Sequence, residues 1–548
     1  MENRKRIILL SGEIACGKST FCKGLEERFG FRILGTRQAL TEIAVAKNQG
    51  TMPSRKVFQA LGRSLDKDTQ GGWVLNHFQS VINQAEAVLI DSVRIPEQID
   101  AFRRAYGQAI YHIHLTAPEE KRRAWFLKRK RKDDDFTTDD DANKKFNEYA
   151  ADPTEKNVKL LEGVADLVIN TADSENTSDH VIRAASFMRI LPAIHHQNVD
   201  VVIGGQFGSE GKGQIAAYLA PEYDCLVRVG GPNAGHKVFN EPYPDVFHII
   251  PSGTNKARTS KLILGPGTMI DVDTLMAEIS KFQLDPTRLV IDENATIISK
   301  KDKKQEEEFD TIGSTKQGVG AATARNLFQD RLQGSVKNKA KSTPVLIPFV
   351  GSAHEEYEKI NSAGKRILLE GTQGTLLSLY NGFYPHVTSR DTTVNGCLSE
   401  AGIGLKRVRR IVMVVRRYPI RVQNPEGGTS GEFYSHEISM ETVSERSGFP
   451  LEEMRKIEKT STTGRQRRIA EFNWALFRRA CELNTPTDIA FTFSDYITYD
   501  NQQARRYDQL SSQTTKFIDE LERCAEVPVS LISTRFSNRS IIDRRNWI

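Results

Sequence analysis

The sequence predicts an α/β protein with two consecutive domains, each built on a mostly parallel sheet. Three observations predict this class. The chain has 548 residues, too many for one ordinary hydrophobic core. Short apolar runs alternate with helical patterns, as expected when helices connect parallel strands. A glycine-rich turn follows an apolar run at 12–17 and again at 204–213, and each turn leads into a helical pattern.

The composition is that of a globular protein that binds small anions. Hydrophobic residues make up 39% and charged residues 27%. The net charge of +6 suits nucleotides and does not argue for nucleic acid. The six cysteines are scattered without C-x-x-C spacing, so we expect reduced thiols in a cytoplasmic protein and no zinc site. The N-terminal apolar run covers four residues, which predicts a strand and not a signal peptide, and no run approaches a membrane span.

The first domain is expected at residues 1–188 and opens with a nucleotide-binding motif. A strand at 7–11 is followed by G-E-I-A-C-G-K-S, which fits G-x-x-x-x-G-K-[ST], and then by a helical pattern to Phe29. Backbone N–H groups of this loop would surround a β-phosphate, Lys18 would reach the β- and γ-phosphates, and Ser19 would hold Mg²⁺. The residues expected at this phosphate site are Gly12, Gly17, Lys18, Ser19 and Thr20.

The rest of this domain supports a nucleotide kinase arrangement. A strand at 87–94 places Asp91 as a Walker-B-like carboxylate. A strand at 109–115 is followed by the residues A-P and then by a basic helix. Candidates to neutralise a transferring phosphoryl group are Arg122, Arg123, Arg129 and Arg131. A strand at 165–170 and a helix at 179–188 complete the pattern. The domain resembles the deoxynucleoside and nucleoside monophosphate kinase group, in which Arg37 and Arg94 would face an acceptor phosphate.

Residues 189–198 are predicted to form a linker, and residues 199–548 a larger domain. This domain carries a series of Gly- and Thr-rich loops, each after an apolar strand. In order they are G-G-Q-F-G-S-E-G-K-G (204–213), G-G-P-N-A-G-H (230–236), G-S-T-K-Q-G-V-G (313–320), E-G-T-Q-G-T-L-L (370–377), V-T-S-R-D-T-T (387–393) and T-T-G-R-Q-R-R (462–468). Such loops at strand ends suit an enzyme that surrounds a polyanionic substrate.

In their order these motifs resemble those of adenylosuccinate synthetase over nearly all of residues 199–540. That family joins aspartate to C6 of a 6-oxopurine nucleotide at the expense of a nucleoside triphosphate and Mg²⁺. The resemblance implies a mostly parallel sheet with helices on both sides and a homodimer. It also implies a ligase with purine nucleotide, L-aspartate and ATP or GTP as substrates.

The resemblance implies roles for particular residues. The expected catalytic residues are His236, Ser209, Lys212 and Glu210. His236 would stabilise charge developing on O6, Lys212 would face the phosphates, and Gly235, by its carbonyl, and Ser209 would be at Mg²⁺. The residues matching the purine nucleotide site are Asn233, Ser314, Thr315, Gln373 and Thr388. Those matching the aspartate and triphosphate site are Thr463, Arg465, Arg467 and Asp495. Bidentate pairing with carboxylates explains the arginines.

The chain departs from the family pattern at Ser209. The usual loop is G-D-E-G-K-G, in which the Asp is the base for N1–H of the purine and a ligand of Mg²⁺; a serine hydroxyl cannot act as a base near neutral pH without an activator. Either the synthetase activity is degraded or the substrate differs. The 2-aminoadenylosuccinate synthetases of the phage Z-base pathway carry Ser at this place and use dGMP. We favour dGMP over IMP, since a small neutral residue leaves room for a 2-amino group.

Other departures concern the triphosphate and the partner subunit. The family's L-T-K-x-D appears as F-T-F-S-D, with Phe493 in place of lysine, and its S-T-G-P appears as S-T-R-F. These changes make ATP or dATP at least as plausible as GTP. The arginine that reaches the partner's nucleotide site aligns with Gln329, with Arg325 and Arg331 nearby, and we assign Arg331 to the nucleotide.

The competing hypothesis is that the first domain is the real enzyme. In that case the second domain would be a degraded nucleotide sensor or an oligomerisation platform. A kinase joined to a deviant synthetase suggests manipulation of nucleotide pools, for example in phage biology or antiviral defence, and no residue separates those settings.

Overall fold

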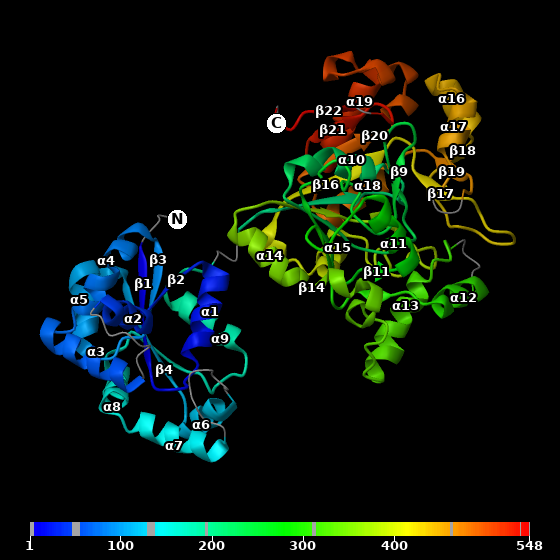
Figure 1. Ribbon diagram of the computed structural model, residues 1–548. Helices are drawn as coiled ribbons and strands as arrows, with labels where there is room; N and C mark the ends of the chain where they lie inside the picture. The colour runs from blue at the N-terminus through cyan, green and yellow to red at the C-terminus, as the bar shows by residue number, and fades with distance from the viewer. Residues whose placement is uncertain are drawn as a thin grey trace. The chain divides into compact units, whose positions relative to one another are not determined.

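The computed structural model describes residues 5–46, 55–128, 138–191, 196–309, 314–460, 464–537 and 539–546. The chain divides into two compact units, Met1–Leu191 and Pro192–Ile548, each with its own sheet (Figure 1). The division falls inside the range 189–198, where the sequence predicts a linker.

The first unit is built on a parallel sheet. Within the described part of this unit the strand order is β2-β3-β1-β4-β5. The strands are β1 (Arg6–Gly12), β2 (Arg32–Gly35), β3 (Ala87–Asp91), β4 (Ile110–Thr116) and β5 (Leu167–Asn170). The central β1 is buried on both faces, which explains its continuous apolar sequence.

Helices cover both faces of this sheet. One core packs α4 and α5 against Ile7 and Leu9 of β1, and the other packs α1 and α9 against Ile8 and Leu10. The helices are α1 (Lys18–Phe29), α2 (Thr36–Ala46), α3 (Arg55–Thr69), α4 (Trp73–Gln84), α5 (Pro96–Tyr106), α6 (Glu119–Lys128), α7 (Asp139–Ala150), α8 (Pro153–Leu160) and α9 (Thr177–Phe187).

Strand β2 is absent from the sequence-based prediction, and the strand expected at 87–94 ends at Asp91. The run R-I-L-G of β2 is short and its Arg32 is exposed, so it lacks the apolar signal of a buried strand. β2 forms because it pairs with β3 at the edge of the sheet, and its own sequence does not indicate this pairing.

The second unit contains a larger sheet. Among its described residues the strand order is β14-β12-β10-β7-β15-β6-β16-β20-β21-β22, parallel except for the last strand. The strands are β6 (Val199–Gly204), β7 (Cys225–Arg228), β10 (Lys261–Leu264), β12 (Leu289–Asp292), β14 (Val350–Gly351), β15 (Ile367–Glu370), β16 (Val408–Arg416), β20 (Asp488–Thr492), β21 (Val529–Ser533) and β22 (Ile541–Asp543).

Two cores sandwich this sheet (Figure 1). Helices α10 (Lys212–Leu219) and α11 (Val272–Lys281) cover one face. The opposite face carries α14 (Ala353–Ser362), α15 (Val394–Ala401), α18 (Trp474–Asn484) and α19 (Ser512–Ala525). Side-chain caps begin several of these helices; the Asp271 carboxylate, for example, accepts from the N–H of Thr274 at 3.0 Å.

Smaller elements lie around the sheet. They are β8 (His236–Val238) with β9 (Asp245–Phe247), β11 (Met269–Ile270) with β13 (Thr296–Ile297), and β17 (Ile420–Val422), β18 (Glu437–Ile438) and β19 (Arg467–Ala470) in one sheet. The remaining helices are α12 (Lys300–Phe309), α13 (Val319–Arg325), the π-helical turn η4 (Asn326–Asp330), α16 (Met440–Ser447) and α17 (Leu451–Ile457).

The sheet order brings the motif-bearing loops together. Strands β15, β6 and β16 are adjacent and parallel, so the loops that follow them emerge from one edge of the sheet. Ligands of open parallel sheets bind in the crevice at this carboxyl edge. In the part of the chain that the structure describes, no helix is long and apolar enough to cross a membrane.

Candidate functional site

The turn between β6 and α10 is held by a buried carboxylate. Glu210 accepts hydrogen bonds at Oε1 from the backbone N–H groups of Gln206 (3.1 Å) and Gly208 (2.8 Å). Its Oε2 accepts from Nζ of Lys212 at 2.6 Å. A Cβ at Gly204 would stand 2.6 Å from Glu210 Oε2 and 2.8 Å from Lys212 Nζ, so only glycine fits. Glu210 therefore shapes the loop and orients Lys212.

His236 stands beside this turn with a buried carboxylate behind it. Its Nδ1 lies 2.5 Å from Oε1 of Glu370, at the end of β15, and 3.3 Å from the hydroxyl of Ser252. Ser252 also donates its backbone N–H to Glu370 at 2.7 Å, and Arg228 lies 3.7 Å from the same carboxylate. A Cβ on Gly213 would be 2.8 Å from Cβ of His236, which places the imidazole against the first turn of α10.

The charges of this pair follow from its surroundings. Burial alone would raise the pKa of Glu370, but Arg228 and His236 outweigh it and lower that pKa to about 2. Burial and Arg228 lower the pKa of His236 to about 4, against the attraction of Glu370. The pair therefore rests as a carboxylate and a neutral imidazole whose Nδ1–H is donated to Glu370, leaving a lone pair on Nε2. A phosphate beside Nε2 would favour the protonated form, which is a donor at that atom.

Arg228 holds the loop that carries His236. Its guanidinium is buried and donates to the carbonyl oxygens of Ala234 (2.9 Å) and His248 (3.1 Å), with longer bonds to Phe247 (3.3 Å) and Ile250 (3.3 Å). Ala234 belongs to the N-A-G-H segment. One buried cation therefore fixes the backbone on two sides of His236.

Ser209 lies within a network of two arginines and a carboxylate. It is exposed and has a φ of 56°. Its hydroxyl oxygen accepts from Nη2 of Arg467 at 3.2 Å, and its carbonyl accepts from Arg416 at 3.4 Å. Glu458 is buried between the two cations, at 3.1 Å from Arg467 Nη1 and in an ion pair with Arg416. Burial would raise the pKa of Glu458, but the two arginines outweigh it and lower that pKa to about 2.

The predicted aspartate clamp is part of the same cationic surface. Thr460 Oγ1 accepts from the backbone N–H of Arg465 at 3.0 Å, which closes the turn before β19. Lys237 follows His236, and burial together with Arg467 lowers its pKa. Thr463, the remaining clamp residue, lies outside the described residues.

Two of the predicted purine ligands present unpaired buried atoms. Among the described residues, Oδ1 of Asn233 and Oε1 of Gln373 are buried without a hydrogen-bond partner. Gln373 also adopts a φ of 64°. Thr388 donates its backbone N–H to the carbonyl of Leu377 at 2.8 Å, which ties its loop to the segment after β15. Unpaired buried polar atoms indicate a place that a polar ligand completes.

The other predicted purine ligands precede or follow α13. Ser314 and Thr315 are partly buried, and the Ser314 hydroxyl accepts from the N–H of Lys316 at 3.2 Å. Arg331 is exposed after η4, and its Nε donates to the carbonyl of Leu327 at 3.1 Å. The structure thus places Arg331 on the surface of the unit.

The segment after β20 carries the predicted triphosphate residue Asp495. This carboxyl is buried and accepts from Nε2 of Gln502 at 3.1 Å, and burial raises its pKa to about 7. Phe493 has a φ of 55°, and its ring lies 3.9 Å from the guanidinium carbon of Arg416. The aromatic residue that replaces lysine is therefore stacked on the arginine that contacts Ser209.

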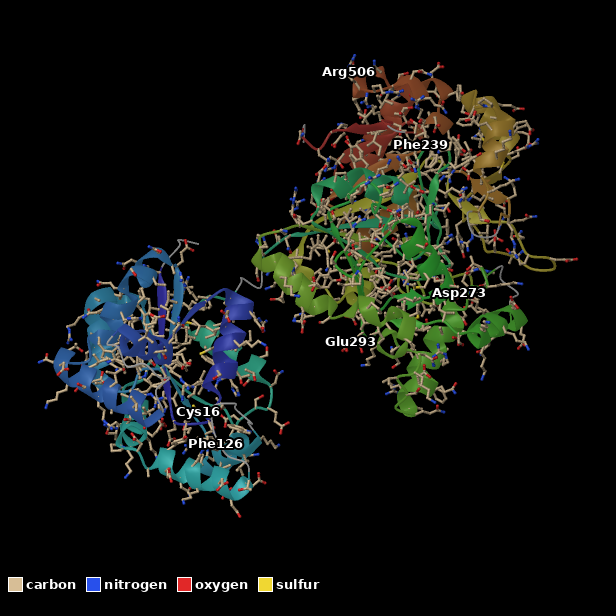
Figure 2. All side chains as sticks on the ribbon, viewed as in Figure 1. Cys16, Phe126, Phe239, Asp273, Glu293 and Arg506 are labelled. Atoms are coloured by element: carbon tan, nitrogen blue, oxygen red, sulfur yellow. The ribbon has the colours of Figure 1, made fainter. Side chains whose placement is uncertain are left out.

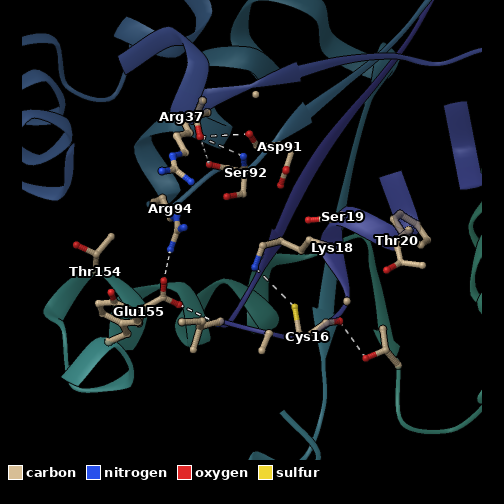
Figure 3. Close-up of a pocket in the computed structure, with 18 of the residues that line it drawn as sticks. Cys16, Lys18, Ser19, Thr20, Arg37, Asp91, Ser92, Arg94, Thr154 and Glu155 are labelled. Atoms are coloured by element: carbon tan, nitrogen blue, oxygen red, sulfur yellow. Dashed lines mark hydrogen bonds and ion pairs between the residues drawn. The ribbon is translucent and has the colours of Figure 1, made fainter. Parts of the chain in front are cut away.

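The first unit holds a cavity of about 1210 Å³ with the glycine loop at one end (Figure 3). Gly17 caps α1 with a φ of 89°, and Nζ of Lys18 donates to the carbonyls of Gly12 (2.6 Å) and Glu13 (2.8 Å). The predicted phosphate ligands that line the cavity are Gly17, Lys18, Ser19 and Thr20. In this structure the Lys18 ammonium is thus hydrogen-bonded to backbone carbonyls of its own loop.

Asp91, at the end of β3, lines the same cavity on the side of Lys18 and Ser19 (Figure 3). Arg122 is buried and pairs with the loop residue Glu13 at 3.0 Å, while its Nε donates to Ala117. The predicted lid residue Arg129 lies outside the described residues. Arg131 lies outside them as well, and of the two described lid arginines, Arg122 and Arg123, it is Arg122 that pairs with the phosphate loop.

The motifs in the sequence assign no role to four charged residues that the structure places in the site. Arg228, Glu370 and Arg416 are each the last residue of a buried strand. A charged residue directly after an apolar run, at the carboxyl end of a parallel strand, is the signal that could have found all three. Glu458 lacks such a signal, because its partners lie elsewhere in the sequence.

The two units differ in how they suit Mg²⁺. In the first, a hydroxyl (Ser19) and a carboxylate (Asp91) line one cavity, which fits a cation bound mainly by nucleotide phosphates. In the second, Ser209 offers a hydroxyl beside a guanidinium, Gly235 offers a carbonyl, and Glu210 is committed to N–H groups and Lys212. Among the described residues no three His, Cys, Asp or Glu side chains gather as a metal site. In the second unit Ser209 and Gly235 would therefore supply protein oxygens to a Mg²⁺ that is bound mainly by nucleotide phosphates.

Comparison with known proteins concerns the second unit. The family model of adenylosuccinate synthetase matches residues 201–333 and 326–501. Adenylosuccinate synthetase of Methanocaldococcus jannaschii is 35% identical over 355 residues, which are 63% of this chain and 96% of that protein. The enzyme of Thermococcus onnurineus is 34% identical over 358 residues, 64% of this chain and 99% of that protein.

Two solved structures share the fold. Fully ligated adenylosuccinate synthetase of Plasmodium falciparum superposes with a TM-score of 0.54 at 21% identity, over 64% of this chain and all of that one. Succinoaminodeoxyadenylate synthetase of cyanophage S-2L, bound to dGMP and to dATP as energy donor, superposes with a TM-score of 0.52 at 24% identity, over 64% of this chain and 95% of that one. By the matched residues and the order of its motifs, this chain belongs to the adenylosuccinate synthetase family.

Proposed function

We propose that the second unit is a ligase that joins L-aspartate to C6 of a 6-oxopurine nucleotide with hydrolysis of a nucleoside triphosphate. The observation that carries this proposal is the position of His236, which packs against the phosphate turn at Gly213 and is backed by Glu370. An imidazole at a phosphate cradle, on a buried carboxylate, suits the stabilisation of charge on an oxygen that is being phosphorylated.

The reaction has two steps. O6 of the purine attacks the γ-phosphorus, the bridging P–O bond to the β-phosphate breaks, and N1 loses its proton. The aspartate amine then attacks C6, and phosphate leaves with the former O6. Lys212 would hold the phosphates, His236 would donate to O6 from Nε2 once it is protonated, and Arg465 with Arg467 would bind the aspartate carboxylates.

We favour dGMP as the purine substrate, with IMP as the alternative. Ser209 is neutral and small, and its oxygen is already bonded to Arg467, so it offers space and no carboxylate at N1. Because Ser209 is exposed, water beside it is the proposed acceptor of the N1 proton. The cyanophage S-2L relative binds dGMP, and the shared fold allows the same substrate here.

We propose ATP or dATP as the phosphoryl donor in preference to GTP. Phe493 replaces the family's lysine. Phe536, in the altered C-terminal motif, packs edge-on against Phe239 with ring centroids 5.8 Å apart; Phe239 is labelled in Figure 2. Aromatic faces bind an adenine ring without needing the donors and acceptors that select guanine.

The test mixes the full chain with Mg²⁺, aspartate, ATP or GTP, and dGMP or IMP, and follows the succinylated purine by chromatography. We expect aspartate-dependent product, with ATP and dGMP as the best pair. No such product with any pair would overturn the ligase proposal and favour a nucleotide-sensing role for the second unit.

A second candidate function, nucleotide kinase, rests on the cavity of the first unit. Its volume of about 1210 Å³ exceeds the usual range for one small ligand, and the glycine loop with Lys18 lies at one end. We propose that it holds a nucleoside triphosphate together with a monophosphate acceptor. Lys18→Ala should abolish conversion of the monophosphate acceptor to its diphosphate and leave aspartate-dependent product unchanged; equal loss of the two would mean that the sites are coupled.

We also propose that the second unit forms a homodimer through the surface around Arg331. Leu327, Phe328 and Leu332 are 62%, 71% and 63% exposed there. An apolar patch of this kind beside a cation suits a partner subunit whose nucleotide site the arginine would enter. Light scattering should show a dimer, and Phe328→Asp should shift it to the monomer.

A further inference from the structure

We propose that the cavity of the first unit reads a guanine nucleoside monophosphate, with Asp66 bound to the base and Arg94 to the acceptor phosphate. This inference rests on the proposed kinase function and names its acceptor. The γ-phosphoryl group would pass from ATP to an oxygen of the acceptor phosphate. The new P–O bond forms as the bridging bond to the β-phosphate breaks, giving two nucleoside diphosphates.

The cavity is lined by two separate groups of charged residues. Lys18, Ser19 and Asp91 lie at the phosphate loop, and Arg37 and Arg94 point into the cavity from the opposite side (Figure 3). The loop takes a triphosphate. The arginines, on segments that follow β2 and β3, therefore define a second anion position across from it.

Asp66 lines the same cavity as these arginines. It lies on α3 and accepts at Oδ1 from Nε1 of Trp73 (2.7 Å) and from Nε2 of Gln98 (2.8 Å). Within the described ranges no hydrogen bond reaches Oδ2. Burial raises the pKa of Asp66 in spite of the two donors, so its carboxylate still lacks donors for its charge.

Trp73 and Gln98 are almost fully buried, 6% and 1% exposed, so the carboxylate that they hold has one orientation. Gln98 also accepts at Oε1 from the backbone N–H of Arg94 at 2.8 Å. Hydrogen bonds through Gln98 thus join the Asp66 carboxylate to the backbone of Arg94, the residue that we assign to the acceptor phosphate. A ligand with a base at one end and a phosphate at the other matches this layout.

The chemistry of Asp66 selects guanine among the common bases. An ionised carboxylate only accepts hydrogen bonds. Guanine presents two adjacent donors, N1–H and the 2-amino group, whereas adenine and cytosine place a ring acceptor next to their single amino donor. The acceptor nitrogen would face the carboxylate and be repelled. Phe58 and Leu40 also line the cavity and supply apolar contacts for a ring.

Arg94 is occupied by a carboxylate that a phosphate can replace. Its Nη1 lies 2.6 Å from Oε1 of Glu155, whose Oε2 accepts from the N–H of Ile14 in the phosphate loop at 3.0 Å (Figure 3). Glu155 therefore bridges the two anion positions. An acceptor phosphate would take the place of Glu155 at Arg94, since a dianion pairs with a guanidinium more strongly than a single carboxylate.

The test incubates the full chain with ATP and Mg²⁺, without aspartate, and separates nucleoside diphosphates by chromatography. The acceptors are dGMP, dIMP, dAMP, dCMP and dTMP. Formation of dGDP is the readout, because the ligase cannot produce it. We expect dGMP to exceed dIMP, which lacks the 2-amino group, by about tenfold or more in kcat/KM.

Asp66→Asn removes the free acceptor but keeps an oxygen for Trp73 and Gln98, so we expect a folded protein that has lost its preference for dGMP. Asp68→Asn, at an exposed position on the same helix, is the matched control and should keep the preference. Equal use of dGMP and dIMP, or a preference that survives in Asp66→Asn, would overturn the inference while leaving the kinase intact. No diphosphate from any acceptor would overturn the kinase itself.

Discussion

Arg467 donates from Nη2 to the hydroxyl oxygen of Ser209 at 3.2 Å, although 258 positions separate them. The oxygen of Ser209 is thereby used as an acceptor, and its proton is left to face the ligand. The same guanidinium is fixed by Glu458 at 3.1 Å. The residue that departs from the family pattern is thus bonded to a residue of the proposed aspartate clamp.

Ser209→Asp should shift the purine preference from dGMP toward IMP. A carboxylate at this place would pair with Arg467 and provide a base for N1–H, while occupying the space that we assign to the 2-amino group. We expect the ratio of kcat/KM for IMP to that for dGMP to rise by about tenfold or more. Steady-state kinetics measure it, and Ser209→Ala should leave the ratio unchanged. A Ser209→Asp enzyme with the original ratio would count against the steric explanation.

Glu458→Gln should destabilise the second unit and weaken aspartate binding. It would leave Arg416 and Arg467 close together without their shared carboxylate, at a cost of about 3 kcal/mol or more in the free energy of unfolding. Denaturant unfolding and the KM for aspartate measure the two effects. Glu437→Gln, which removes the exposed partner of Arg468, should cost less than about 1 kcal/mol. Equal costs for the two variants would contradict the importance of the buried network.

Glu370→Gln should lower kcat by about 100-fold while changing KM little. A neutral amide cannot stabilise the imidazolium of His236, and it no longer fixes the proton on Nδ1. Aspartate-dependent turnover at saturating substrates gives kcat. Glu355→Gln, on the exposed face of α14, is the control and should behave as the unmodified enzyme. A larger effect on KM than on kcat would assign Glu370 to ground-state binding.

The parts of the site that the sequence predicts are those carried by local motifs. The two glycine turns follow β1 and β6, where the apolar runs place them, and the α/β class with its mostly parallel sheets is confirmed. Contacts between residues far apart in the sequence could not be predicted from local motifs. Glu458 meets Arg416 across 42 positions, and nothing in either local sequence announces the pair.

A second limit is the role of a residue within its motif. The motif groups Glu210 with the catalytic residues, but its carboxylate is hydrogen-bonded to two backbone N–H groups and to Lys212. Burial and hydrogen-bond partners decide such a role, and a spacing pattern contains neither. The short edge strand β2 was missed for a related reason, since its pairing with β3 lies in the fold and not in its sequence.

The first unit should lose stability as pH falls from about 6.5 to 4. Ser11 Oγ lies 2.8 Å from Nε2 of His112 and 2.8 Å from Nδ1 of His114, all buried. Burial lowers the pKa of each histidine to about 4. Between those pH values the unfolded chain binds protons that the folded unit excludes, so stability is complete above pH 6.5 and decreases toward pH 4, by up to roughly 3 kcal/mol per histidine.

Hydrogen exchange of β1 and β4 across this pH range measures the loss within the first unit. His114→Gln removes one titrating group and should flatten the profile, even if it lowers stability at pH 7. A profile with the same slope in His114→Gln would show that other groups control the acid transition.

Phe493→Lys should move the triphosphate preference from ATP toward GTP. The ring of Phe493 stacks on Arg416 at 3.9 Å and lies 5.3 Å from the ring of Tyr496. A lysine restores the family residue beside Asp495 and removes the aromatic face, so we expect the ratio of kcat/KM for GTP to that for ATP to rise by about tenfold. Phe493→Leu removes the face without adding a charge, and should weaken ATP use with no gain for GTP.

GTP use by the unmodified enzyme should also depend on pH. Guanine donors need the ionised form of Asp495, and burial raises the pKa of this carboxyl to about 7. A lysine at position 493 would lower this pKa, so the comparison is made in the unmodified enzyme. There GTP use should decrease from pH 8 to pH 6, because the carboxyl takes up a proton and ceases to be a double acceptor, while ATP use changes less. Initial rates at fixed substrate across this range give the comparison. A GTP preference that is independent of pH would mean that Asp495 does not contact the base, and the loss of the lysine would then have to act through Arg416.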